Sequence, residues 1–167
     1  LRAVALMRRA GLEVSGLLTE RTGPHDLSVD ELHTGITYPL TLPFEEGKDQ
    51  PLMNFRMDGD AMARSCSALA QGFPTDVIVI DELGPLELKR GQGWVEALDY
   101  LRDGEYDVGI LVIRPELLWT SMQRLPRSIY TVVRVTLENR DRIPATLAEI
   151  AMTAVDPGQT GEEDGKL

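Results

Sequence analysis

The sequence predicts an α/β fold in which a mostly parallel sheet carries helices on both faces. Short, apolar, β-branched runs alternate along the chain with segments of helical periodicity, which is typical of a parallel sheet covered on both sides. A separate stretch alternates with period two and predicts an antiparallel hairpin added to the sheet. The chain has 167 residues, 43% of them hydrophobic, which suits one domain with a substantial core.

The first part of the chain predicts one helix followed by one strand. Residues 1–10 (LRAVALMRRA) favour a helix, and Gly11 is a suitable residue to end it. Residues 12–18 (LEVSGLL) are mostly apolar and predict a strand. The polar stretch at 21–26 contains Gly-Pro and predicts a turn.

Period-two alternation predicts two short antiparallel strands between residues 36 and 57. The first run has apolar side chains of one parity at Ile36, Tyr38, Leu40, Leu42 and Phe44. A second run of the same kind follows at Met53, Phe55 and Met57. Proline cannot donate to a ladder, so Pro39 and Pro43 place the first run at an edge of the sheet.

The rest of the chain predicts a helix and then three strand–helix units. The helix begins near Asp58 and ends at Gly72, with one apolar face formed by Met62, Cys66, Leu69 and Phe73. Further strands are expected at 76–80, 108–113 and 129–135, and further helices at 94–101, 117–125 and 143–154. The polar residues 156–167 predict a flexible acidic tail, which leaves 1–155 as the domain.

Charge and cysteine content exclude several classes of function. Lys and Arg total 17 against 27 Asp and Glu, so the formal net charge is −10. That balance argues against a nucleic-acid partner, which requires basic surface. A single cysteine, Cys66, excludes an internal disulfide and favours a reducing compartment. No apolar run approaches the ~20 residues of a membrane helix, so we expect a cytoplasmic protein with no membrane partner.

The segment 76–88 (DVIVIDELGPLEL) has the form of a Walker B motif, because a buried strand ends in two carboxylates, Asp81 and Glu82. A carboxylate fixed at a strand end can hold a hydrated Mg²⁺, which prefers oxygen ligands. The next residue points to a different side and can orient or deprotonate an attacking water. Acidic residues at strand ends are also common as solvated groups, and the pattern alone leaves both interpretations open.

The matching phosphate-binding motif, G-x-x-x-x-G-K-[ST], does not occur in the sequence. Gly47-Lys48 and Gly165-Lys166 both lack the earlier glycine. Backbone N–H groups and the lysine of such a loop supply most of the phosphate binding. These residues alone are therefore expected to bind nucleotide weakly or not at all.

Several motifs together resemble the small nucleoside-triphosphatase family of P-loop proteins, also called the cancer-related NTPase family. The most specific are IDELGPLEL at 80–88 and VTLENRD at 135–141. Supporting matches follow the same order, at 14–20 (VSGLLTE), 54–69 (NFRMDGDAMARSCSAL) and 111–118 (LVIRPELL). The resemblance spans about residues 1–154. It implies a three-layer P-loop NTPase-type fold whose first strand and P-loop would precede Leu1.

The resemblance also implies a function and a set of site residues. The family hydrolyses nucleoside triphosphates, such as ATP or GTP, to the diphosphate and phosphate with Mg²⁺. By carry-over, Asp81 resembles the magnesium-side Walker B aspartate and Glu82 resembles the catalytic glutamate. Hydrolysis of nucleoside triphosphate is therefore the expected reaction, with the triphosphate as partner.

Other polar residues follow predicted strands, and each has a functional and a structural interpretation. Arg114 could reach a γ-phosphate or pair with Glu116 at the surface. Thr19 and Glu20 could position water or metal, or be solvated. Asn139 and Arg140 follow the last predicted strand. Asn139 could contact a nucleotide or cap the final helix. Arg140 could contact a phosphate or pair with a nearby carboxylate.

Two other classes of function remain open at this stage. The chain could be a nucleotide-sensing or interaction module that has lost its P-loop and its catalysis. It could also be a phosphotransferase of related fold, in which an acceptor other than water receives the γ-phosphate. The coding sequence before Leu1 and the identity of the phosphate acceptor distinguish these alternatives from the hydrolase.

Overall fold

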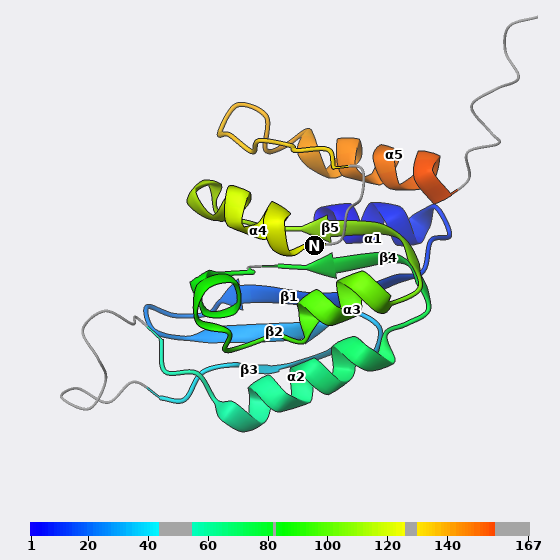
Figure 1. The fold of residues 1–167 in the computed structure, drawn as a ribbon. Helices are drawn as coiled ribbons and strands as arrows, with labels where there is room; N and C mark the ends of the chain where they lie inside the picture. The colour runs from blue at the N-terminus through cyan, green and yellow to red at the C-terminus, as the bar shows by residue number, and fades with distance from the viewer. Residues whose placement is uncertain (44–54, 82, 126–129, 156–167) are drawn as a thin grey trace, which may run out of the picture.

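An open five-stranded sheet forms the centre of the fold (Figure 1). The structure is a computed structural model that describes residues 1–43, 55–81, 83–125 and 130–155. Within these ranges the strand order is β3-β2-β1-β4-β5. The strands are β1 (Val14–Arg21), β2 (Leu27–Glu31), β3 (Ile36–Pro39), β4 (Thr75–Ile80) and β5 (Tyr106–Leu111). Strands β1, β4 and β5 run parallel, and β2 and β3 extend the sheet as an antiparallel hairpin.

Helices cover both faces of this sheet, as Figure 1 shows. One face carries α1 (Arg2–Arg9) and α5 (Ile143–Val155), which pack against each other. The other face carries α2 (Gly59–Gln71) and α3 (Ala97–Asp103). Shorter segments lie between strands and helices: η1 (Leu86–Arg90), η2 (Pro115–Leu117) and α4 (Leu118–Arg124). The predicted three-layer α/β architecture with an antiparallel addition is confirmed.

The two faces of β4 explain why this strand is apolar at consecutive positions. Ile78 and Ile80 face the cluster formed with α2 and α3, whereas Val77 and Val79 face the cluster formed with α1 and α5. All four side chains are buried. A strand with helices on both faces has no solvent-facing side, so it shows no alternation of polar and apolar residues.

Several predicted boundaries are confirmed and have local causes. Helix α1 ends before Gly11, and α2 starts after Asp58. The Asp58 carboxylate accepts hydrogen bonds from the N–H groups of Asp60 and Ala61 at 2.9 and 3.3 Å, which caps the first turn. The predicted helices at 117–125 and 143–154 correspond to α4 and α5.

The hairpin predicted between 36 and 57 is confirmed in part, because residues 40–42 pair antiparallel with 56–58 through the Thr41–Met57 bridge and two backbone hydrogen bonds, whereas β3 itself has another partner. Strand β3 ends at Pro39 and pairs with β2, a strand that the sequence interpretation missed. Polar residues in LSVDE obscured the alternation of Leu27, Val29 and the buried Glu31. Met57 makes one antiparallel bridge, to Thr41, and the stretch 44–54 lies outside the described residues. The edge position predicted from Pro39 is confirmed.

The strand predicted at 129–135 is also wrong for the part that the structure describes. Residues 130–135 join no strand of the sheet. Most of their apolar side chains remain exposed, with Val132 at 59% and Val135 at 62%, whereas Val133 is half-buried. The sheet ends at β5 on that side, so no described strand lies beyond β5 to pair with this segment.

The residues predicted to form a flexible acidic tail, 156–167, lie outside the described part of the chain, so the tail stays a prediction. None of the helices in the described ranges combines the length and hydropathy that crossing a bilayer requires.

Gly16 allows β1 to approach β4 closely. Its φ is +117°, and a Cβ at this position would overlap the carbonyl oxygen of Val79 on β4. Gly16 and Val79 are partners in the parallel register. Because a backbone oxygen cannot move aside without breaking the ladder, only glycine fits here.

We expect Gly16→Ala to lower the free energy of unfolding by at least ~3 kcal/mol, since it combines strain with backbone overlap. Urea denaturation monitored by circular dichroism measures this change. The matched control is Gly35→Ala, which has a φ of +72° but nothing within 4 Å of the added Cβ. The control is expected to cost about 1 kcal/mol from conformation alone. Equal losses for the two variants would contradict the importance of the close approach.

Candidate functional site at the carboxyl ends of the strands

Asp81 lies directly after β4, at the edge of the sheet where the parallel strands end. Its N–H donates to the carbonyl oxygen of Leu17 on β1 at 3.0 Å. On the other side, the N–H of Val112 donates to the carbonyl oxygen of Ile80 at 3.1 Å. The ladder therefore continues past both β4 and β5, and the backbone at Asp81 is held between two neighbouring strands.

Thr19 is the residue that the structure brings to Asp81. Both the N–H and the hydroxyl of Thr19 lie 3.4 Å from Oδ2 of Asp81 and can donate to it. The sequence predicted that Thr19 would follow the first strand. In the structure Thr19 lies within β1, because β1 continues to Arg21 by pairing with β2. The parallel pairing with β4 ends earlier, at Leu17. Two residues singled out separately in the sequence are thus adjacent in space.

Glu20 and Arg114 lie in the neighbourhood of this edge. Glu20 is the next residue of β1 and is exposed. Arg114 comes two residues after Val112, immediately before η2, and its side chain is also exposed. Glu82 lies outside the described residues, between Asp81 and the buried Leu83. The carboxyl edge of the sheet therefore brings the Asp81 carboxylate and the Thr19 hydroxyl together, and Arg114 follows the end of the neighbouring strand β5 by three residues.

Glu87 holds the loop that follows Asp81, a role that the sequence interpretation did not assign. Its carboxylate is buried and accepts hydrogen bonds from the N–H groups of Gly84 at 2.9 Å and Trp94 at 3.1 Å. Arg124 on α4 donates to the Glu87 carbonyl oxygen at 3.3 Å. A glutamate within the apolar stretch LGPLEL was the available signal, because a buried carboxylate needs hydrogen-bond donors.

Asn139 and Arg140 occupy the turn before α5. The Asn139 side chain accepts from the N–H of Thr136 at 2.7 Å and donates to the carbonyl oxygen of Arg134 at 2.8 Å. These bonds fix the turn, so Asn139 has a structural role there, but they reach residues that precede the turn and not the first turn of α5, where the sequence interpretation placed a cap. Arg140 is exposed on the same turn.

Cys66 and Trp94 have packing roles rather than chemical ones. Burial, aided by the nearby Glu96 carboxylate, raises the pKa of the Cys66 thiol to about 11. The thiolate form is therefore scarce at neutral pH, which argues against a nucleophilic role. The Trp94 indole N–H donates to Ser65 Oγ at 2.7 Å in the core. Among the described residues, no group of three or more His, Cys, Asp and Glu could hold a metal ion.

A second polar cluster joins the β2–β3 hairpin to α2. The buried Glu31 accepts from Thr34 Oγ1 at 2.7 Å and from Arg64 Nε at 3.1 Å. Burial opposes ionisation, but the hydrogen bonds from Thr34 and Arg64 and the positive charge of Arg64 outweigh it and lower the pKa of Glu31. The Arg64 guanidinium also lies 4.1 Å from the centroid of the Tyr38 ring. These contacts account for the cluster as a structural one.

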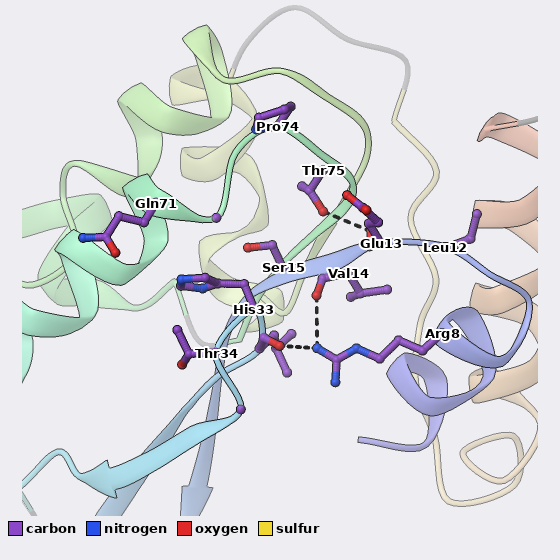
Figure 2. Close-up of a pocket in the computed structure, with 13 residues that line it drawn as sticks. Arg8, Leu12, Glu13, Val14, Ser15, His33, Thr34, Gln71, Pro74 and Thr75 are labelled. Atoms are coloured by element: carbon purple, nitrogen blue, oxygen red, sulfur yellow. Dashed lines mark hydrogen bonds between the residues drawn. The ribbon is translucent and has the colours of Figure 1, made fainter.

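A cavity of about 540 Å³ lies at the opposite end of the sheet, where β1 and β4 begin (Figure 2). Its lining includes Val14 and Thr75, the first residues of these two strands. A six-residue strand spans about 20 Å, so the cavity is well separated from Asp81. It contains none of the site residues that the sequence predicted.

Comparisons with known proteins identify a family and a similar fold. A family model described as NTPase matches residues 58–148, which is more than half of the chain and includes Asp81, Arg114 and Asn139. No curated protein matches. Among solved structures, a crystal structure of THEP1 from the hyperthermophile Aquifex aeolicus is similar, with a TM-score of 0.58 and 19% sequence identity. The similarity covers 90% of each chain and shows a shared fold.

We expect Glu87→Ala to lower the free energy of unfolding by about 3 kcal/mol, because it leaves two buried N–H groups without their acceptor. Urea unfolding measures the loss, and the exposed Glu105→Ala serves as control with an expected change below about 0.5 kcal/mol. If Glu87→Ala unfolds like the control, the carboxylate does not hold the loop.

Proposed function

Because the chain belongs to the NTPase family, we propose that it hydrolyses nucleoside triphosphates to the diphosphate and phosphate with Mg²⁺. The observation that carries this proposal is the placement of Asp81. It follows a strand whose last four residues are buried, its backbone is hydrogen-bonded to β1, and Thr19 reaches its carboxylate. Ligands bind outside the carboxyl ends of the strands in open α/β sheets.

The residues at this edge fit a magnesium ion. The Asp81 carboxylate and the Thr19 hydroxyl are oxygen donors, and Mg²⁺ is typically bound through one or two protein oxygens together with substrate phosphates and water. A bound ion would neutralise charge on the β- and γ-phosphate oxygens. In this proposal Asp81 is the magnesium-side carboxylate, and Thr19 orients it.

The proposal assigns water activation to Glu82. Successive side chains at a strand end point in different directions, so a carboxylate next to Asp81 can reach the water that attacks the γ-phosphate. Glu82 would orient that water and accept its proton as the new bond to phosphorus forms. Arg114, after the neighbouring strand, would pair its guanidinium with the charge that develops on the γ-phosphate.

We further propose that a parallel strand preceding α1 supplies the phosphate-binding loop that the 167 residues lack. The support is the β5 edge, which no described strand pairs. Helix α1 begins at Arg2, so such a strand and its loop would lead directly into the amino terminus of this helix. A helix amino terminus favours phosphate through its N–H groups and dipole. Such a strand would also give the extended residues 130–135 a neighbour to pair with.

A cytoplasmic location is part of the same proposal and is supported by the free thiol of Cys66, which suits a reducing compartment. The observation that favours a non-catalytic module instead is the absence of G-x-x-x-x-G-K-[ST] from these residues. The coding sequence directly before Leu1 decides between the two. A glycine-lysine loop there supports hydrolysis, whereas a start codon at Leu1 supports the module.

In the protein that includes this upstream sequence, Glu82→Gln is expected to lower Mg²⁺-dependent phosphate release by ~10²- to 10⁴-fold. Nucleotide binding should persist, because Glu82 acts on water rather than on the phosphates. Phosphate release is followed with a coupled assay, and binding with a fluorescent nucleotide.

The exposed Glu105→Gln is the matched control and should leave both measurements unchanged. Undiminished hydrolysis by Glu82→Gln would remove the role given to Glu82. Transfer of the labelled γ-phosphate to an acceptor other than water would instead identify a phosphotransferase.

A further inference from the structure

Strand β1 extends further than its parallel neighbour β4 at the carboxyl edge of the sheet. The parallel ladder ends at the pair Leu17–Ile80, whereas β1 continues to Arg21 by pairing with β2. Residues 18–21 of β1 therefore extend past the last residue of β4, beside Asp81. This extension forms one side of the candidate site.

Arg21 is the last residue of this extension and lies on the same face of β1 as Thr19. Side chains two residues apart on a strand share a face, and their Cα atoms are about 7 Å apart. Glu20, between them, belongs to the opposite face. Because Thr19 reaches the Asp81 carboxylate, Arg21 places a positive charge just beyond that contact. Ligands of open α/β sheets bind in this region, outside the carboxyl ends of the strands.

The Phe55 ring and a backbone carbonyl hold the Arg21 guanidinium at this edge. Cζ of Arg21 lies 5.2 Å from the centroid of the ring, and Nη2 donates to the carbonyl oxygen of Pro24 at 2.9 Å. Phe55 is placed by the antiparallel bridge between Thr41 and Met57, two residues further along the chain. These contacts restrict the side chain before any ligand binds, so less conformational entropy is lost on binding.

Most donors of the Arg21 guanidinium remain available for an anion. Arginine carries five N–H donors, and within the described ranges the bond to Pro24 is the only hydrogen bond that this side chain makes. The ring contact occupies a face of the planar group, whereas the donors point outward from its edge. The side chain is also exposed. Such a cation suits a phosphate group, which it can bind through two parallel hydrogen bonds.

We propose that Arg21 contacts the γ-phosphate of the bound nucleotide and makes the site prefer triphosphates to diphosphates. This inference rests on the proposed function, because it assigns a second cation to the same site. Strand β4 lies between β1 and β5, which are about 10 Å apart. Arg21 on β1 and Arg114 after β5 therefore lie on opposite sides of Asp81. A diphosphate has no γ-phosphate, so it offers Arg21 no partner in this position.

Isothermal titration calorimetry tests this role in the protein that includes its upstream sequence, with Mg²⁺ and either a non-hydrolysable nucleoside triphosphate or the matching diphosphate. Arg21→Gln is expected to weaken binding of the triphosphate by at least ~10-fold and of the diphosphate by less than ~2-fold, because a charged hydrogen-bonded contact to the γ-phosphate is lost. Phe55→Leu should reduce the same preference by about 2- to 5-fold, because the guanidinium loses its ring contact. Arg21→Lys should retain part of the preference, since it keeps the charge.

Arg102→Gln is the matched control. Arg102 is exposed and pairs with Asp99 and Asp103 just before β5, at the opposite edge of the sheet, so both affinities should stay unchanged. Retained diphosphate binding shows that a variant is folded at the site. If the unmodified protein binds both nucleotides and Arg21→Gln loses no preference for the triphosphate, this inference is overturned while the proposed hydrolysis stands. If the unmodified protein binds neither nucleotide, both fail.

Discussion

The pairing of β4 between β1 and β5 is the constraint on which the rest of the structure depends. Gly16 lets β1 approach the Val79 carbonyl, and the parallel register that follows brings Leu17 beside Ile80. The same ladder then fixes the backbone of Asp81 through the Leu17 carbonyl oxygen. Gly16 also fixes the register of β4, because a shift of one residue would place a side chain against the Val79 carbonyl oxygen. The position of the candidate site is therefore a consequence of core packing.

The sequence was sufficient to predict helices and strands that have local signals in their own residues. Strand β4 and helices α1, α2 and α5 were predicted because continuous apolar runs and caps such as Asp58 are local signals. The pairing of the hairpin was not local. Glu31 is buried only because Arg64 and Thr34, on other segments, supply donors, so LSVDE did not resemble a strand. The segment 130–135 shows the converse, since strand-like composition cannot form a sheet without a neighbour.

The site was predicted in its residue types but not in its contacts. Asp81 was identified because it ends a buried strand, whereas its bond to Thr19 depends on β1 continuing past its parallel partner. Glu87 gave a weak sequence signal because its role arises from the backbone N–H groups of Gly84 and Trp94. The two ends of the sheet differ. The carboxyl end presents an oxygen-donor pair, and the amino end presents a cavity of about 540 Å³.

The location of the proposed metal–nucleotide site is tested most directly by paramagnetic broadening. Mn²⁺ with a non-hydrolysable nucleoside triphosphate, added to the ¹⁵N-labelled protein that includes its upstream sequence, broadens amide signals near the metal. Oxygen-ligand chemistry makes Mn²⁺ a suitable substitute for Mg²⁺. The amide signals of Thr19, Asp81 and Val112 should broaden, while those of Ser15 and Gly72 stay sharp. Broadening centred on Ser15 and Gly72, or none near Asp81, would contradict a metal–nucleotide site at the carboxyl ends of the strands.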